Sequence, residues 1–481
     1  MKKTALGIMA MAASMMHAQS KEYSLNFDSE KYTVETAQVA GKEISFRAYK
    51  NVVYVSCPVD AEYQSMNIYI PVEYYEGKNI RKYNSNTAPI FLPNNVGGYM
   101  PAKAGTAGKD QRTGEDNAIL VALSKGYVVA SPGARGRTLT NDKAQYIGKA
   151  PAAIVDLKAA VRYLRFNDKI MPGNAEKIIS NGTSAGGALS SLMATTIDHP
   201  DFEPFLEEIE AFNSTDKIFA ASCYCPITNL EHADMAYEWQ FNSVPHYSRK
   251  KMVMTDGGRP SFSAEDGELT ELQFALSGQL KALFPDYLNN LHLMDSNGDP
   301  LLLDADGKGS FVDYLGKLLL ASAKKENVDV ASIPWLDESG KLDIDGFACD
   351  ITRMKTPPAF DDITGHSPEN DLFGDQTISC KHFTTFSYEH STGGVELADM
   401  DVVKMLNPMH YIDDEKATTA QHIRIRHGQR DRDTSLAISA ILAAKLRQSG
   451  ADVDYQSPWG VEHAGDYDLE ELFDWIDRIS K

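Results

Sequence analysis

The run Gly182-Thr183-Ser184-Ala185-Gly186 places a serine between two glycines, after a predicted strand and before a run of small residues. In that setting a G-x-S-x-G string forms a nucleophile elbow, because glycine lets the backbone turn sharply and leaves the serine hydroxyl exposed. The N-terminus of the following helix directs N–H groups to the same spot. The string also occurs by chance as an ordinary Gly/Ser turn, but its position between strand and helix favours Ser184 as a nucleophile.

A serine hydroxyl becomes a strong nucleophile only when a general base takes its proton, so an acid and then a histidine are expected further along the chain. Asp431 follows a strand predicted to end at His427, and Asp433 competes for the same role, although it lies two residues nearer the next helix. His463 follows the last predicted strand, and it alone of the 12 histidines holds that position. The sequence therefore predicts a triad of Ser184, Asp431 and His463.

An acyl-transfer intermediate also needs N–H donors for its oxyanion, usually from the residue after the nucleophile and from the loop after the third strand. Ala185 supplies the first donor. The second is expected from Gly97 or Gly98 in Asn94-Asn-Val-Gly-Gly-Tyr99, where glycine allows close backbone approach. A Gly-Gly turn without this role is the alternative.

The elements expected to position these residues alternate between strands and helices. Short apolar runs bounded by Gly and Pro predict strands, and apolar residues three and four apart predict helices. Strands are expected at 65–71, 88–92, 127–130, 177–180, 219–225, 422–427 and 453–456, and helices at 154–164, after 184, at 436–446 and at 469–479. This pattern predicts an α/β class with a mostly parallel sheet flanked by helices, and with the elbow it predicts the α/β-hydrolase fold.

The alternation stops between about 231 and 400. Two amphipathic helices are predicted there, one from Leu269 to Leu283 and one from Phe311 to Leu319, separated by polar stretches rich in Asp and Gly. We expect residues 231–400 to form a large inserted helical cap, or lid, and residues 19–230 together with 401–481 to form the catalytic domain.

The composition is that of a globular protein, with 43% hydrophobic and 24% charged residues in 481. A net charge of −20 disfavours nucleic acid as a partner. Beyond the first twenty residues no run reaches the roughly 18 apolar positions of a membrane span. Residues 1–18 have the order of a secretory signal, with Lys2 and Lys3 before an apolar run and Ala18 at the expected cut. We expect export to the periplasm or the cell exterior, and no membrane association after the signal is removed.

The cysteines and the Asp-rich loops predict neither a disulfide scaffold nor a metal site. Cys223 and Cys225, two of only five cysteines, lie where a strand would direct both side chains to one face, and packed thiols are expected. The runs Asp295–Asp299 and Asp304–Gly307 resemble calcium loops, but Pro300 replaces the glycine that an EF-hand requires. We expect solvated turns there, and no metal or other cofactor in catalysis.

Several strings in the chain resemble those of one known family, the bacterial tannases of the α/β-hydrolase type, which cleave galloyl esters. The resemblance runs from Asn94 to His463. Its most specific strings are Met354-Lys-Thr-Pro-Pro-Ala-Phe360, Ser367-Pro-Glu-Asn-Asp-Leu-Phe-Gly374 and Asp431-Arg-Asp-Thr-Ser435. The resemblance implies the triad already named and assigns the galloyl hydroxyls to Lys355, Glu369 and Asp433.

The neighbours of the nucleophile and of the histidine are Thr183, Glu462 and Ala464. Fungal-type tannases and feruloyl esterases carry cysteines flanking these two residues, so that subfamily does not match.

Gallate presents three adjacent phenolic hydroxyls, so a matching pocket needs carboxylate acceptors and a cationic donor. From composition alone, Lys355 and Glu369 would be surface charges on the cap, whereas the resemblance implies that they form a substrate clamp. The expected partner is a small galloyl ester, hydrolysed through an acyl-enzyme to release gallic acid. A feruloyl esterase, another secreted serine hydrolase or peptidase, and a binding protein on a hydrolase scaffold are the alternatives.

Overall fold

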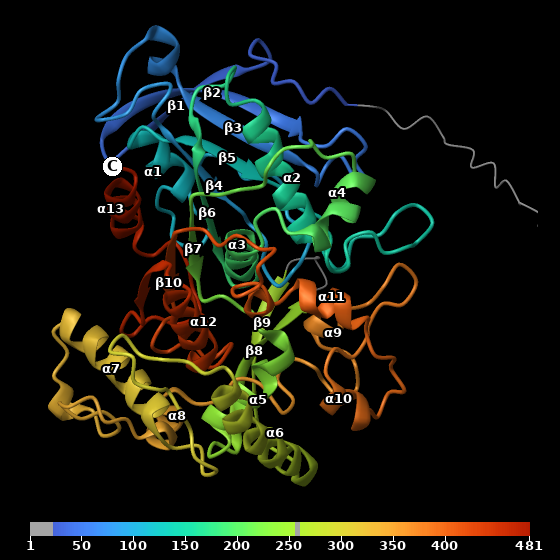
Figure 1. Ribbon diagram of the computed structural model, residues 1–481, viewed down its shortest axis with the longest axis vertical. Coiled ribbons are helices and arrows are strands. Elements are labelled where there is room, and N and C mark those ends of the chain that lie inside the picture. Colours follow the sequence, from blue (N-terminus) through green and yellow to red (C-terminus); the bar gives the residue numbers. More distant parts are fainter. Residues whose placement is uncertain (1–22, 255–259) are drawn as a thin grey trace, which may run out of the picture.

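The computed structural model describes residues 23–254 and 260–481, and its central feature is a nine-stranded sheet with the order β1-β2-β3-β5-β4-β6-β7-β10-β11 (Figure 1). The first three strands and β5 pair antiparallel, and β5 to β11 pair parallel. The strands are β1 (Thr33–Val39), β2 (Lys42–Val53), β3 (Ser65–Pro71), β4 (Pro89–Pro93), β5 (Val128–Pro132), β6 (Asn174–Thr183), β7 (Ala220–Tyr224), β10 (His422–Arg426) and β11 (Asp452–Gln456).

The parallel strands are short apolar runs because helices cover both faces of the sheet. In Figure 1, α1 and α13 lie on one side of it, and α2, α3 and α12 lie on the other. The covering helices are α1 (Ala118–Ser124), α2 (Ala152–Phe166), α3 (Ala185–Thr195), α4 (Glu203–Glu208), α12 (Leu436–Gln448) and α13 (Leu469–Ile479). Short 3₁₀ helices lie at Val72–Glu76, Pro200–Phe202, Val330–Ser332 and Pro408–His410. The α/β-hydrolase fold predicted from the sequence is confirmed.

A long insertion separates β7 from β10, which are neighbours in the sheet. In the described part of the chain, none of its residues adds a strand to the main sheet. It contains α5 (Leu230–Phe241), β8 (His246–Met254), β9 (Pro260–Glu268), α6 (Glu271–Asn290), α7 (Ser310–Lys325), α8 (Ile344–Ile351), α9 (Pro368–Leu372), α10 (Thr385–Glu389) and α11 (Met400–Met405). The cap boundaries of 231 and 400 stay a prediction.

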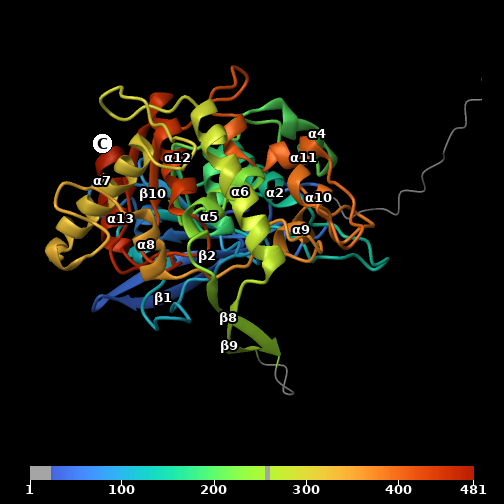
Figure 2. The ribbon, with the colours of Figure 1, turned by 90° about the horizontal axis from the view of Figure 1, so that it is seen from below.

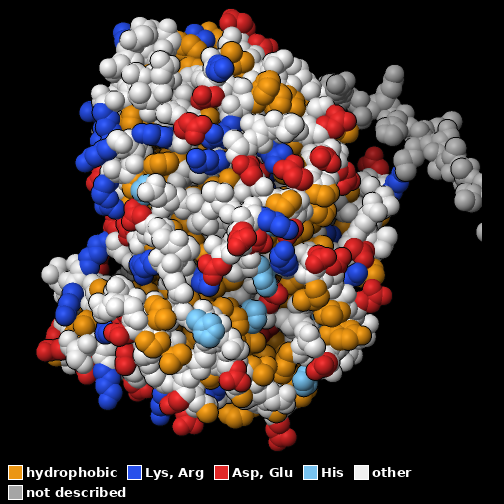
Figure 3. Space-filling model, viewed as in Figure 1, with side chains coloured by type: hydrophobic (Ala, Val, Ile, Leu, Met, Phe, Trp, Pro, Cys, Tyr) orange, Lys and Arg blue, Asp and Glu red, His pale blue; other side chains and the backbone are white. Residues whose placement is uncertain are grey.

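The sequence predicted a helical insertion, but the structure shows that part of it is a pair of strands. Strands β8 and β9 form an antiparallel hairpin that projects from the body of the molecule (Figure 2). The hairpin continues from α5, and Ser248 N donates a hydrogen bond to Arg353 O at its base. Apolar side chains show at the surface over the inserted helices, and acidic and basic side chains are interspersed on the face in Figure 3.

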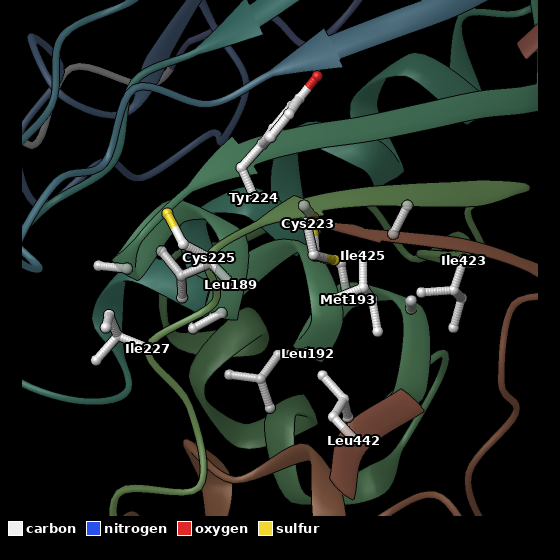
Figure 4. Close-up of a cluster of buried hydrophobic side chains, with 14 of the residues drawn as sticks. Leu189, Leu192, Met193, Cys223, Tyr224, Cys225, Ile227, Ile423, Ile425 and Leu442 are labelled. Atoms are coloured by element: carbon white, nitrogen blue, oxygen red, sulfur yellow. The ribbon is translucent and has the colours of Figure 1, made fainter. Parts of the chain in front are cut away.

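A cluster of buried side chains between α3, β7 and β10 supports the end of β6 (Figure 4). Leu189, Leu192 and Met193 of α3 face Ile423 and Ile425 of β10 across this cluster. Because protein interiors are close-packed, a turn built on such a base has little freedom to shift. The first residues of α3 are therefore held firmly against the sheet.

The predicted secretory segment 1–18 lies outside the described residues. Within the described ranges, no helix combines the length and apolarity that crossing a membrane requires.

Candidate active site

Ser184 lies on a sharp turn between β6 and α3. Its φ is +61°, in the region that non-glycine residues rarely adopt, and such strain concentrates at functional sites. A Cβ on Gly182 would lie 2.3 Å from Gly186 O, and one on Gly186 would lie 2.5 Å from the side chain of Asn94. Only glycine fits these two positions, so the G-x-S-x-G string forms the tight elbow that the sequence predicted.

The loop after β4 approaches the elbow from the neighbouring strand. Gly98 has a φ of +54°, and a Cβ placed on it would meet no atom within 4 Å, so this glycine faces open space. Arg137 holds the loop, because its Nε donates to Gly98 O at 2.8 Å and its backbone N–H donates to Tyr99 O at 2.9 Å. Gly98 and Ala185 line the same pocket, whereas Gly97 is not among the residues that line it.

His463 and Asp431 meet across two loops that follow β10 and β11. His463 Nδ1 lies 2.8 Å from Asp431 Oδ2 and 3.9 Å from Asp433 Oδ2. Burial acts against the charge on His463, but the Asp431 carboxylate and the Cys225 sulfur together outweigh it and hold the pKa of His463 well above its ordinary value. Burial acts to raise the pKa of Asp431, but His463, together with His427 and the backbone N–H of Asp433, outweighs it and lowers that pKa. The buried Asp431 and the half-buried His463 form an ion pair with the second aspartate beside it.

Among the described residues, no hydrogen bond joins Ser184 Oγ to His463, and neither His463 nor Asp431 lines the pocket that contains Ser184. In unliganded enzymes such bonds are often long and shorten only when substrate binds.

Cys225 is the feature near the elbow that sequence reasoning missed. It lies just beyond the end of β7 with a φ of +35°, so it does not share a strand face with Cys223 as expected, although both thiols are buried. Its Sγ lies 3.9 Å from His463 Nε2 and donates to Ala464 O at 3.4 Å. Burial raises the pKa of the Cys225 thiol, and His463 opposes this rise. No spacing in the sequence links residue 225 to the histidine loop.

The ligand-type atoms of Cys225, Asp431 and His463 lie within 4.8 Å of one another, which invites comparison with a metal site. Ligands held tetrahedrally by zinc at about 2.0–2.3 Å lie roughly 3.3–3.8 Å from one another. His463 Nδ1 and Asp431 Oδ2 are only 2.8 Å apart, which is a hydrogen-bond distance. Asp431 and Cys225 also face different nitrogens of the imidazole ring. This arrangement suits a histidine oriented by an acid better than it suits a metal ion.

One pocket of about 460 Å³ brings the elbow together with the predicted clamp residues. Its lining includes Ser184 and Ala185 from the elbow and Lys355, Glu369 and Asp433 from three other segments. Two of these, Lys355 and Glu369, come from the insertion, and Asp433 comes from the loop after β10. The structure thus places all three predicted clamp residues around the candidate nucleophile.

The clamp combines a buried acid with a cation. Burial raises the pKa of Glu369, and the ammonium of Lys355 opposes that rise. The Lys355 Nζ lies 3.8 Å from the centroid of the Phe360 ring, a favourable cation–π contact. Glu369 lies in the first turn of α9, whose capping box joins Ser367 and Asn370. A buried carboxylate with a perturbed pKa that faces a pocket is a candidate for ligand binding.

The Asp-rich loops at 295–307 lie away from this pocket. The Asp295 carboxylate accepts hydrogen bonds from the backbone of Asn297 and Asp299, and the Asp304 carboxylate accepts from Asp306 and Lys308. Both aspartates therefore close exposed turns with their own backbone, as Asp commonly does.

Comparison with known proteins agrees with the fold and extends over nearly the whole chain. The crystal structure of Fusobacterium nucleatum tannase is 50% identical with a TM-score of 0.91, and the match covers 96% of this chain and 100% of that one. Tannase from Lactobacillus plantarum is 43% identical with a TM-score of 0.91, covering 95% and 100% of the two chains. A tannin acyl hydrolase in complex with ethyl gallate is also 43% identical, with a TM-score of 0.88 over 95% and 99%.

Two further matches are more local. A family model described as BD-FAE matches residues 98–257. Esterase LipQ of Mycobacterium tuberculosis is 28% identical over 109 residues, a match that spans 22% of this chain and 24% of the esterase.

The fold of the chain, its nucleophile elbow and its similarity to tannases and an esterase together define a carboxylic ester hydrolase of the α/β-hydrolase class. Within that class, the chain belongs to the bacterial tannase family.

Proposed function

We propose that this protein hydrolyses galloyl esters, both in tannins and in simple gallate esters, and releases gallic acid. The observation that carries the proposal is the single pocket that joins Ser184 to Lys355, Glu369 and Asp433. A hydroxyl nucleophile at one wall and two carboxylates with an ammonium at the others match an ester whose acyl part carries several hydroxyls. The relative that was crystallised with ethyl gallate supports the same choice of substrate.

The reaction follows from the triad. His463 Nε2 takes the proton of Ser184 as the serine attacks the ester carbonyl, and it then gives that proton to the departing alcohol. Asp431 holds Nδ1–H from the far side of the ring, which fixes the tautomer and stabilises the imidazolium. Water, activated by the same histidine, then releases gallate from the acyl-enzyme.

The oxyanion of each tetrahedral intermediate is stabilised by backbone donors. Ala185 N–H is available at the start of α3, where the helix has no internal acceptor for it. Gly98 N–H supplies the second donor from the loop after β4, in preference to Gly97. The helix dipole of α3 adds positive potential at the same point.

The clamp selects the acyl group. The carboxylates of Glu369 and Asp433 accept hydrogen bonds from the galloyl hydroxyls, and the Lys355 ammonium donates one. Asp433 is suited to this role because its side chain lines the pocket, while Asp431 is buried against His463. Two aspartates separated by a single residue therefore have separate tasks.

Two broader features complete the proposal. Residues 1–18 direct export to the periplasm or the cell exterior, and residues 231–400 act as a cap that supplies Lys355 and Glu369 to the site.

Replacing the nucleophile tests the proposal at its chemical step. The variant Ser184→Ala should fold normally and lose galloyl ester hydrolysis by about 10⁶-fold, the size expected when the nucleophile of a triad is removed. Gallic acid release from methyl gallate measures the loss, with thermal melting as the control for folding. Retained turnover in a folded variant would exclude Ser184 as the nucleophile.

A further inference from the structure

Tyr237 lies in α5 and is not among the residues that line the pocket. Its ring is fully buried, packed against Phe241 and Phe360 with ring centroids 4.6 and 6.3 Å away. The hydroxyl is tied to two segments distant in sequence. It accepts hydrogen bonds from the backbone N–H groups of Met354 and Lys355, each at 3.0 Å, and donates to Arg432 O at 3.1 Å.

A tyrosine hydroxyl has one donor and two acceptor positions. All three are used here, and all three partners are backbone groups. Arg432 stands between the two aspartates of the site, so its peptide carries Asp433. One buried oxygen atom therefore connects the main chain of Lys355 to the main chain that presents Asp433.

Neighbours on the same helix reinforce this link. Arg353 pairs with Glu238 of α5 at 2.6 Å, with both side chains fully buried, and its Nε donates to Lys355 O at 2.9 Å. The main chain of Lys355 is thus held at its nitrogen by Tyr237 and at its oxygen by Arg353. Asp234 of α5 accepts from Phe360 N at 2.7 Å, which fixes the ring beneath the Lys355 ammonium.

The triad has anchors that do not involve Tyr237. Asp431 N donates to Gly428 O, and Arg430 N donates to Val461 O, each at 2.9 Å. The Asp431 carboxylate is held by His463 and by the backbone N–H of Asp433. Loss of the Tyr237 hydroxyl therefore leaves the Asp431–His463 pair in place. This loss removes the direct tie between the main chain of Lys355 and the peptide of Asp433, while the Arg432–Thr352 hydrogen bond still joins the two segments.

We infer that Tyr237 is a positioning residue that sets the spacing between Lys355 and Asp433 and so determines selectivity for hydroxylated acyl groups. The inference rests on the proposed function, because it assigns Tyr237 to the galloyl clamp. Removing the Tyr237 hydroxyl should lower kcat/KM for esters whose acyl part hydrogen-bonds to the clamp, but not for esters whose acyl part lacks hydroxyls.

The test compares Tyr237→Phe with the unmodified protein on methyl gallate and on p-nitrophenyl acetate, which has no acyl hydroxyl. We expect kcat/KM for methyl gallate to fall about ten- to a hundredfold, because three buried backbone groups lose their partner. The value for p-nitrophenyl acetate should change by less than about threefold, since the triad keeps its own anchors.

A matched control is Tyr455→Phe. Tyr455 is also buried, and its hydroxyl contacts only Ser439 and Ser457, at 3.3 and 3.2 Å, among the described residues. This variant loses a buried hydroxyl without touching the clamp segments, so it should affect both substrates equally. Thermal melting checks that each variant folds.

Should Tyr237→Phe not fold, Thr352→Ala replaces it, because Thr352 Oγ1 accepts a hydrogen bond from Arg432 Nη1 at 2.5 Å and links the same two segments.

A double-mutant cycle distinguishes a role of Tyr237 in positioning Lys355 from a general destabilisation of the protein. In a Lys355→Met background, Tyr237→Phe should cause little further loss on methyl gallate, because the group that it positions is gone. The inference would be overturned if Tyr237→Phe lowered kcat/KM equally on both substrates or did not lower it on methyl gallate. It would also be overturned if the effects of Tyr237→Phe and Lys355→Met were fully additive. If the unmodified protein did not prefer methyl gallate to methyl benzoate, the proposed function would fail instead.

Discussion

Two aspartates separated by a single residue have different surroundings, and these predict different roles. Asp431 is buried with its carboxylate 2.8 Å from His463 Nδ1, whereas Asp433 lines the pocket. We expect Asp431→Asn to lower kcat by about 10⁴-fold on every ester, because the wrong imidazole tautomer is stabilised. We expect Asp433→Asn to weaken galloyl esters far more than p-nitrophenyl acetate. Steady-state kinetics on both substrates measure this, and the reverse pattern would mean that the roles are exchanged.

The pH dependence of hydrolysis should report the charge of His463. The Asp431 carboxylate raises the pKa of His463 despite burial, and only the neutral imidazole can accept the proton of Ser184. Activity should therefore be lost as pH falls, with a midpoint above the ordinary histidine value of about 6.5. Asp431→Asn removes the stronger of the two influences that raise the pKa, leaving the weaker one of Cys225 against burial, which lowers it. The midpoint should therefore move to lower pH. A pH profile of kcat/KM that does not move in this variant would argue against the pairing.

At the scale of an element, the segment that carries Glu369 depends on one buried carboxylate. Asp361 is fully buried and accepts hydrogen bonds from Asn370 Nδ2 and His382 Nδ1, each at 2.7 Å, and from the backbone of Phe383 and Thr384. Asn370 belongs to the capping box of α9. The short helix that presents Glu369 is therefore held by Asp361 rather than by its own length, since five residues alone would not stay helical.

We expect Asp361→Ala to lower the free energy of unfolding by about 3–5 kcal/mol, the usual cost of removing one partner from a buried charged network. Hydrolysis of gallate esters should fall with it, because Glu369 loses its support. Asp337→Ala is the control: Asp337 closes an exposed turn through Ser339 and Lys341, so its loss should change the free energy of unfolding far less than the loss of Asp361. Urea unfolding measures both variants, and equal stability of the two would contradict this account of α9.

At the scale of the whole molecule, the sheet and its helices were predictable because their patterns are local. Buried parallel strands such as β4 and β5 are short apolar runs, and α13 repeats apolar residues at helical spacing. Strands β1 and β2 were not predicted, because both mix exposed with buried residues; β1 is the edge strand of the sheet and β2 is its neighbour. The β8–β9 hairpin was missed because its sequence lacks a run of alternating apolar residues.

The candidate active site was predictable only in part, because only some of its residues lie in a local sequence pattern. The elbow and the order of acid and histidine are properties of the chain, so Ser184, Asp431 and His463 could be proposed from sequence. Lys355 and Glu369 carry no local signal of their own, and their role in a clamp was predicted only through family resemblance. Tyr237 and Cys225 had no signal at all, because their contacts join segments that only the folded chain brings together.

The central claim is that the pocket recognises a galloyl group, and the most direct test compares acyl groups in the unmodified enzyme. Methyl gallate, methyl benzoate and methyl ferulate should be assayed side by side for kcat/KM. A site built to hydrogen-bond hydroxyls leaves its own buried groups unpaired with benzoate, and the methoxy group and longer spacer of ferulate do not fit the clamp. The account predicts that methyl gallate is favoured by about 10⁴-fold or more over each of the others. Comparable values for methyl gallate and methyl ferulate would contradict it and indicate a general esterase.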